Sequence, residues 1–181
     1  MKNYSFLKVV SAISIAILGL SLAAQVSFDV PIGNGIPITG QSFAILLIGY
    51  FLDWRLSFVS VFIYLVLGAI GVPILAEGKS GIDVITGLSG GYLVGFLPAV
   101  VLVSKWEYDK RNDLLHTFQT FLFVTGIILI IGIMRLSFDL GFIRAIAIGL
   151  KPFWVGAIVK VLLAIMVIYL YLRYSTKEEE R

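Results

Sequence analysis

Six long apolar segments constrain the fold of this chain more than any other feature of its sequence. They cover residues 6–27, 41–52, 56–72, 84–105, 116–136 and 152–173. A bilayer core of about 30 Å needs about 20 mainly apolar residues per helix, and most of these segments approach that length. The second segment is short, and Asp53-Trp54-Arg55 makes a tight helical hairpin of the second and third. The sequence therefore predicts an all-α integral membrane protein with six transmembrane helices.

The amino-acid composition supports a membrane protein and argues against several soluble classes. Hydrophobic residues make up 59% and charged residues 14% of the 181 residues, against about 45–50% and about 25% in soluble domains. The excess apolar surface must face lipid, which argues against a cytosolic enzyme, a nucleic-acid-binding module and a disordered protein. Since the loops are short, we expect one six-helix domain over 1–181 with a short charged tail at 175–181.

The distribution of lysine and arginine predicts the orientation in the membrane. Nine fall on one side of the six segments: Lys2, Lys8, Arg55, Lys105, Lys110, Arg111, Arg173, Lys177 and Arg181. Three fall on the other side: Lys79, Arg144 and Lys151. Cytoplasmic loops carry the excess of positive charge, so both termini are predicted in the cytoplasm. Loops 30–40, 73–83 and 137–151 then face outward in a multi-pass protein of the cell membrane.

The first segment carries a stripe of small residues at helical spacing. Its members are Ala12, Ala16, Gly19 and Ala23. Such stripes let two helices approach closely in lipid, so the stripe either packs inside this chain or docks a second membrane subunit. Lys2 and Lys8 before an apolar stretch also fit a cleaved signal peptide, but this apolar run is longer than a typical signal sequence.

The sequence offers no catalytic or metal-binding set of residues, so we expect neither an enzyme nor a cofactor. Cysteine is absent, and the single histidine, His116, has no other ligand type in sequence reach. Glu107, Asp109 and Asp113 are most simply a solvated cytoplasmic turn. All eleven acidic residues map to loops, segment ends or the tail, which disfavours ion-coupled transport because such relays use intramembrane carboxylates.

A nucleotide site is also not expected. Gly78-Lys79-Ser80 imitates the end of a phosphate-binding loop, but Pro73 stands where that motif requires a glycine. The chain is then either a binding subunit energised by other proteins or a self-sufficient membrane carrier or channel for a small anionic solute.

Lys160 is the most unexpected residue because it lies within the last apolar segment. It is seven residues beyond Phe153, or about 10 Å along a helix. A lysine at the centre of a membrane helix costs roughly 2.5–3.5 kcal/mol on insertion scales. A lysine that faces the bundle would bind an anionic or carbonyl-bearing ligand; the alternative is a snorkelling or structurally paired side chain.

Further polar groups gather at the outward end of the predicted bundle. Thr39 and Gln41 lie where the second segment begins, and Lys79 lies in a polar, glycine-rich lid candidate at 73–83. Gly90 and Tyr92 belong to the glycine-rich opening of the fourth segment; Tyr92 suits the wall of an organic-ligand pocket or an interfacial aromatic belt. The predicted ligand-binding residues are Thr39, Gln41, Lys79, Gly90, Tyr92 and Lys160.

Four stretches of the sequence resemble the BioY family. They are Pro37-Ile38-Thr39-Gly40-Gln41, Tyr64-Leu65-Val66-Leu67-Gly68-Ala69-Ile70-Gly71-Val72-Pro73, Gly90-Gly91-Tyr92-Leu93-Val94-Gly95-Phe96, and Pro152-Phe153 with Gly156 and Lys160. The resemblance implies a six-helix S component of an energy-coupling factor transporter, which captures biotin from outside. It also implies partners, namely a transmembrane coupling subunit and two ATPases, with the stripe of small residues as the docking surface.

One position departs from the family pattern. The family usually carries an aspartate three residues before the lysine of the last segment, and this chain has Ala157 there. The resemblance therefore implies a pocket whose charge differs by about one unit. Either Lys160 binds a ligand carboxylate or carbonyl unaided, or another acid such as Asp83 or Asp139 substitutes. The ligand is then biotin held differently, or a related anionic small molecule.

Overall fold

The computed structural model describes residues 5–28, 36–110 and 112–179, and is mostly helical. Its helices are α1 (Phe6–Gln25), α2 (Gln41–Phe51), α3 (Trp54–Ala69), α4 (Ile82–Thr86), α5 (Gly90–Glu107), α6 (Leu114–Leu140), α7 (Phe142–Gly149) and α8 (Phe153–Glu179). A single 3₁₀ turn, η1, covers Ala76–Gly78. Two short strands, β1 (Ser27–Phe28) and β2 (Ile38–Thr39), pair antiparallel, an element that the all-α prediction did not include.

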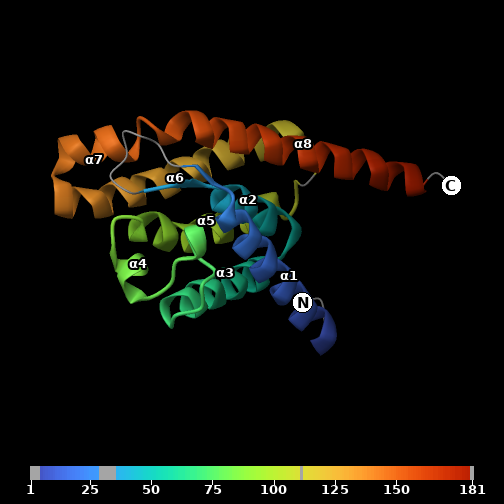
Figure 1. The fold of residues 1–181 in the computed structure, drawn as a ribbon. Coiled ribbons are helices and arrows are strands. Elements are labelled where there is room, and N and C mark those ends of the chain that lie inside the picture. The colour runs from blue at the N-terminus through green and yellow to red at the C-terminus, as the bar shows by residue number, and fades with distance from the viewer. Residues whose placement is uncertain (1–4, 29–35, 111, 180–181) are drawn as a thin grey trace.

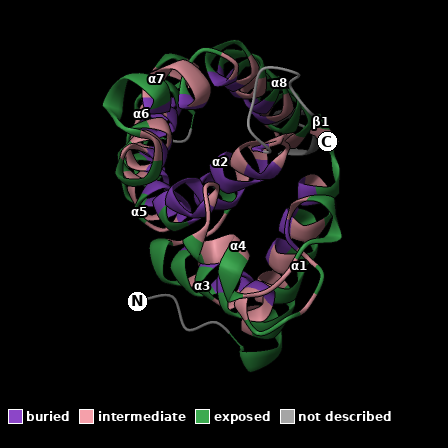
Figure 2. Ribbon diagram, turned by 60° about the vertical axis from the view of Figure 1, so that its left-hand side comes forward, coloured by how far each residue is buried: buried purple, intermediate pink, exposed green. Residues whose placement is uncertain are grey.

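Helices α2 and α5 lie at the centre of the bundle. Helix α5 packs against α6, α2 and α3, while α8 runs along α6 and α2 (Figure 1). The buried stretches concentrate on α2 and α5, and the outer faces of the surrounding helices are exposed (Figure 2). Helices α4 and α7 lie at one end of the bundle, and the first turns of α1 and the last turns of α8 lie toward the other (Figure 1).

Two aspartates begin helices on the side of the bundle away from α4 and α7. The side chain of Asp53 accepts hydrogen bonds from the backbone amides of Arg55 and Leu56, and it caps α3 immediately after α2 ends. Asp113 caps α6 in the same way. Such caps satisfy amide groups that have no partner within the first turn of a helix. The break predicted at residues 53–55 is confirmed, but α2 and α3 pack mainly against α1 and α5 and make few contacts with each other.

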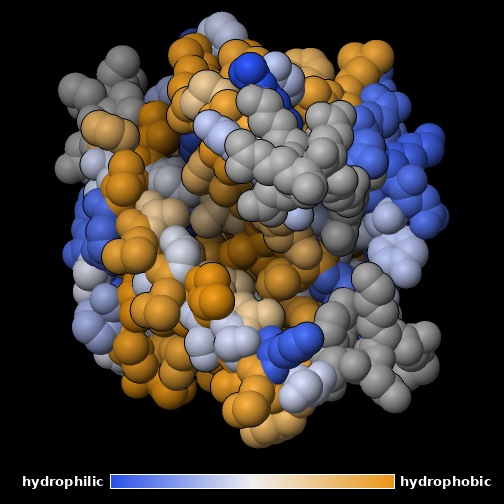
Figure 3. All heavy atoms as spheres, turned by 90° about the vertical axis from the view of Figure 1, so that its right-hand side faces the viewer, coloured by the Kyte–Doolittle hydropathy of each residue, from blue (hydrophilic) through white to orange (hydrophobic). Residues whose placement is uncertain are grey.

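Three of the described helices are long and apolar enough to cross a membrane. They are Phe6–Gln25, Leu114–Leu140 and Phe153–Ser175, which match the first, fifth and sixth predicted segments. Helices α2 and α3 are apolar but shorter. Apolar side chains cover much of the surface in Figure 3, interrupted by patches of hydrophilic side chains.

The fourth predicted segment is not one continuous helix. Helix α4 ends at Thr86 and α5 begins at Gly90, so the chain turns within the range 84–105. A Cβ at Gly90 would lie 1.9 Å from the backbone oxygen of Ile85. The turn brings two backbone segments so close together that only glycine fits. Because hydropathy is averaged over the whole segment, it does not indicate this break.

The predicted loops and tail also contain more helix than expected. Helix α6 continues to Leu140, and α7 occupies most of the predicted loop 137–151. Gly141 separates the two helices with a φ of +75°. Helix α8 continues to Glu179, so the charged tail predicted at 175–181 starts as helix, and 180–181 lie outside the described residues. Most of the predicted loop 30–40 also lies outside them.

Candidate ligand-binding site

A cavity opens between α2, α5, α6, α8 and the segment that carries η1 and α4. It is partly open, and its walls are mainly apolar with several polar side chains among them. Small-molecule sites combine apolar walls with a few polar groups in the same way. This cavity has that character. Its lining residues are Ile36, Pro37, Thr39, Gln41, Ser42, Leu75, Ala76, Lys79, Val84, Ser89, Tyr92, Leu93, Phe96, Thr125, Ile128, Leu129, Phe153, Ala157 and Lys160.

Lys160 reaches from α8 into the cavity and binds the start of α2. Its Nζ donates hydrogen bonds to the backbone oxygen of Thr39 at 3.0 Å and to Ser42 Oγ at 2.9 Å. An ammonium group has three donors, so one remains for a ligand. Lys160 faces the bundle as predicted, and it is paired with a carbonyl and a hydroxyl group of the chain itself, which is the alternative of a structurally paired lysine. Ligand binding by its remaining donor stays a prediction.

A chain of hydrogen bonds runs from Thr39 through Gln41 to Tyr64. Thr39 Oγ1 donates to Gln41 Oε1 at 2.8 Å, and Gln41 Nε2 donates to the Tyr64 hydroxyl at 2.7 Å. Tyr64 in turn donates to the backbone oxygen of Ile74 at 3.0 Å. The chain joins β2, α2 and α3 to the loop before η1. Gln41 is 3% exposed, so this polar network fixes one wall of the cavity.

Tyr92 forms the wall on the side of α5. Its ring stacks on Phe153 with the centroids 5.4 Å apart, and its hydroxyl donates to the backbone oxygen of Gly149 at 3.0 Å. The side chain is 8% exposed, which is incompatible with a lipid-facing aromatic belt. Because the hydroxyl already binds α7, Tyr92 offers its ring to the cavity.

The other two predicted ligand-binding residues differ in position. Lys79 lines the cavity from the end of η1, with its Nζ 2.5 Å from Glu77 Oε2. Gly90 does not line the cavity; it accommodates the Ile85 backbone in the turn before α5. Five of the six predicted residues therefore meet around one cavity.

Ala157 lines the cavity, as expected for the position of the family acid. It is 8% exposed and lies on α8 one turn before Lys160. Neither proposed substitute acid is at the cavity: Asp83 is on α4 away from the lining, and Asp139 pairs with Arg135 at 2.6 Å. Among the described residues, the lining thus contains two lysines and no carboxylate.

Several lining residues were not predicted from the sequence. They are Ser42, which accepts from Lys160; Phe153, which stacks on Tyr92; and Ser89 and Thr125. The serine-lysine contact joins residues far apart in the sequence, and a threonine in an apolar span has no feature that distinguishes it. Tyr64 does not line the cavity but binds the lining residue Gln41. Its position in one of the four stretches that resemble the BioY family is the sequence feature that could have indicated it.

The small residues of α1 line a separate groove on the surface. The groove lies between α1 and α2, and its walls include Phe43, Ala44 and Leu47 of α2. Its floor contains the predicted stripe Ala12, Ala16, Gly19 and Ala23. Ala16 is buried, whereas a Cβ added at Gly19 would meet nothing within 4 Å. Ala16 thus packs within the chain, whereas the groove is open at Gly19.

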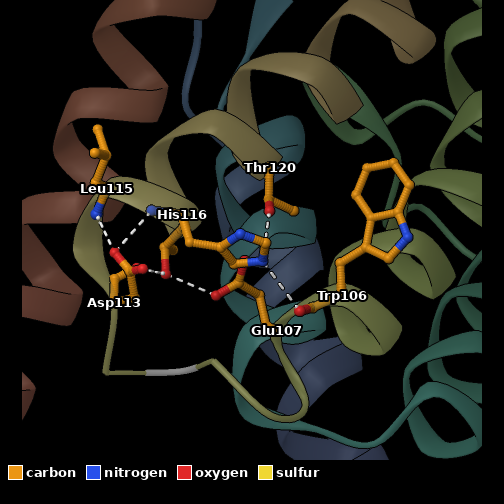
Figure 4. Close-up of polar contacts among 7 residues, drawn as sticks. Trp106, Glu107, Asp113, Leu115, His116 and Thr120 are labelled. Carbon is orange, nitrogen blue, oxygen red and sulfur yellow. Dashed lines mark hydrogen bonds and ion pairs between the residues drawn. The ribbon is translucent and has the colours of Figure 1, made fainter.

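The acidic turn between α5 and α6 is not uniformly solvated. Glu107 is fully buried, and its Oε2 accepts a hydrogen bond from Thr117 Oγ1 at 2.6 Å. The His116 ring lies beside Glu107 (Figure 4), with Nε2 3.7 Å from Glu107 Oε1. The prediction of a solvated turn is therefore wrong for Glu107, because the ends of α5 and α6 pack together over it, and holds for the exposed Asp109 and Asp113.

Comparisons with known proteins agree on one family. The BioY family matches residues 1–177 of this chain. A protein of Pyrococcus horikoshii named "Probable biotin transporter BioY" is 35% identical over 160 residues, which cover 88% of this chain and 93% of that protein. The "Biotin transporter BioY" of Thermotoga maritima is 31% identical over 154 residues, which cover 84% of this chain and 88% of the relative.

A solved structure has the same fold. It is the crystal structure of the S-component for biotin from an ECF-type ABC transporter. The two structures superpose with a TM-score of 0.84 at 20% sequence identity, covering 96% of this chain and 95% of the other. With a match over nearly its whole length and relatives above 30% identity, this chain belongs to the BioY family.

Proposed function

We propose that this chain is the substrate-binding membrane subunit, or S component, of an energy-coupling factor transporter, and that it captures biotin from outside the cell. The single observation that carries this proposal is the cavity in which Lys160 lies, enclosed by the fold of a BioY-family protein. The names of the relatives supply the ligand class, since those proteins are called biotin transporters.

Capture would use the charge of Lys160 in a site whose walls are mainly apolar. Biotin combines a neutral cyclic urea, a thioether ring and a chain that ends in a carboxylate. Lys79 is paired with Glu77, whereas the described partners of Lys160 are a carbonyl and a hydroxyl group, so the Lys160 ammonium is the cation that a carboxylate or carbonyl group of the ligand would bind. The apolar walls, including the Tyr92–Phe153 stack, suit the ring system.

The proposed topology has six membrane crossings with both termini in the cytoplasm. The crossings are α1, α2, α3, the α4–α5 unit, α6 and α8. The excess of lysine and arginine at the end of the bundle away from α4 and α7 supports this orientation. The segment around Lys79, which lines the cavity, then lies at the outward end of the bundle.

Energy for transport would come from other proteins. We propose a transmembrane coupling subunit and two ATPase subunits as partners, with the groove between α1 and α2 as the docking surface for the coupling subunit. Support comes from the open, apolar character of that groove around Gly19, since small residues permit close helix contacts in lipid.

Calorimetric titration of the purified full-length protein with biotin and desthiobiotin tests the ligand. Saturable binding with one site per chain is expected, and absence of binding would overturn the biotin assignment. Uptake of labelled biotin by cells that express the chain with and without the energising subunits tests the role. Equal concentrative uptake without those subunits would favour a self-sufficient carrier instead.

A further inference from the structure

The hydroxyl group of Thr125 is a buried polar group for which the structure provides no partner. Its Oγ1 makes no hydrogen bond to any residue that the structure describes. Thr125 lies on α6 and lines the cavity, and its side chain is only 8% exposed. Threonine in a helix commonly donates to the carbonyl four residues earlier, and this hydroxyl does not. Buried polar groups are rarely left unpaired, so Thr125 requires an explanation.

The surroundings of Thr125 make an unpaired hydroxyl costly in the empty protein. Ile128 and Leu129, three and four residues further along α6, share its helix face and are apolar lining residues. Phe96 on α5 adds a further apolar side chain to the lining. An unpaired hydroxyl in an apolar environment is unfavourable unless a partner arrives. A ligand group that enters the cavity can be that partner.

The chemistry of the lining indicates which ligand group this can be. Ala157 has no side-chain oxygen, the oxygens of Thr39 and Gln41 bind each other, and Ser42 Oγ accepts from Lys160. Ser89 adds a hydroxyl from the turn before α5. The hydroxyl of Thr125 can accept a hydrogen bond as well as donate one. A neutral group suits this apolar part of the wall, because transfer of a carboxylate there would be far more costly.

We propose that Thr125 is a specificity-determining residue whose hydroxyl binds a neutral polar group of the ligand, the cyclic urea in the case of biotin. The hydroxyl supplies an acceptor oxygen to a cavity in which position 157 has none. This inference rests on the proposed function for the identity of the ligand, but its own basis is the unpaired hydroxyl in the cavity wall.

Ser60 provides a matched control within the same chain. Its Oγ is also buried without a hydrogen-bond partner among the described residues, but Ser60 does not line the cavity. An unpaired hydroxyl alone therefore does not define a ligand contact. If both hydroxyls were only tolerated defects of packing, their removal would have the same effect on ligand binding.

The test compares biotin affinity, measured by calorimetry, for wild type, Thr125→Val, Thr125→Ser and Ser60→Ala. Thr125→Val keeps the shape and removes the hydroxyl, so we expect affinity to fall by at least about 5-fold, the effect of one unpaired buried group. Thr125→Ser keeps the hydroxyl and should stay within about 2-fold of wild type, as should Ser60→Ala. The melting temperature without ligand should not fall in Thr125→Val.

The outcomes separate this inference from the proposed function. Wild-type binding of biotin with unchanged affinity in Thr125→Val would overturn the role of Thr125 alone. An equal loss in Thr125→Ser and Thr125→Val would assign the effect to packing and would also overturn it. No biotin binding by wild type would overturn both proposals. If Thr125→Val does not fold, Thr125→Ala removes the same hydroxyl and is judged by the same criteria.

Discussion

Lys160 Nζ lies 3.0 Å from the backbone oxygen of Thr39, a residue 121 positions earlier in the chain. The contact joins α8 to strand β2 at the point where α2 begins. It places a cation in the cavity and also holds together two elements that line it. Removal of this side chain should therefore affect both ligand affinity and the geometry of the site.

Lys160→Ala should weaken biotin binding by roughly 1.5–3 kcal/mol, because a hydrogen bond to a charged donor is lost. Calorimetry on the purified variant measures this change. Lys105→Ala is the control, since Lys105 is exposed and does not line the cavity. Wild-type affinity in Lys160→Ala would contradict the placement of the ligand beside Lys160.

Ala157→Asp should maintain or tighten biotin binding. Position 157 lines the cavity one helical turn before Lys160, so the new carboxylate can pair with the ammonium and accept from the neutral urea. Ala157→Asn has nearly the same size without the charge and separates the two effects in titrations with biotin. Weaker binding in the aspartate variant alone would mean that an anionic group of the ligand lies at this position.

Gly19→Trp should prevent docking of the coupling subunit and preserve biotin binding. A side chain at Gly19 extends into open space in the groove, whereas Ala16 is buried and its enlargement would disturb the chain itself. Co-purification with the coupling subunit should fall, as should uptake in cells. Leu18→Trp is the control, because Leu18 is 62% exposed on α1 and does not line the groove. Undiminished co-purification of Gly19→Trp would place the interface elsewhere.

Gly90→Ala should destabilise the ligand-free protein. The added Cβ would lie 1.9 Å from the Ile85 backbone oxygen, and such overpacking typically costs about 1–3 kcal/mol. A thermal melt in detergent measures the loss. Gly126→Ala on α6 is the matched control, since a Cβ there meets nothing within 4 Å and should leave stability unchanged or raised. An unaltered melting temperature in Gly90→Ala would show that the turn relaxes freely.

The sequence predicted site residues best where a residue type is energetically unfavourable in its local sequence context. Lys160 stands out because a charge within an apolar segment is costly, and the motifs around Thr39 and Tyr92 indicate the same cavity. The hydropathy pattern located the three longest helices for a similar reason, since apolar length is a local property.

The remaining features depend on contacts between distant segments. Burial of Glu107 requires the ends of α5 and α6 to meet, and the break at Gly90 depends on the path of the Ile85 backbone. Thr125 resembles any threonine of an apolar helix until its hydroxyl is seen to lack a partner in the cavity wall. Local patterns cannot contain this information, because neither burial nor hydrogen-bond satisfaction is a property of one segment.

The first turn of α2 lines both the ligand cavity and the groove beside α1. Gln41 and Ser42 line the cavity, while the next two residues, Phe43 and Ala44, line the groove beside α1. A rigid displacement of this turn by a molecule in the cavity also moves a wall of the groove, and the reverse holds too. If a partner in the groove changes the affinity of the cavity for its ligand, the ligand changes the affinity of the groove for the partner by the same free energy. If the groove docks a partner as proposed, ligand binding in the cavity and partner binding in the groove would therefore influence each other equally through these four consecutive residues.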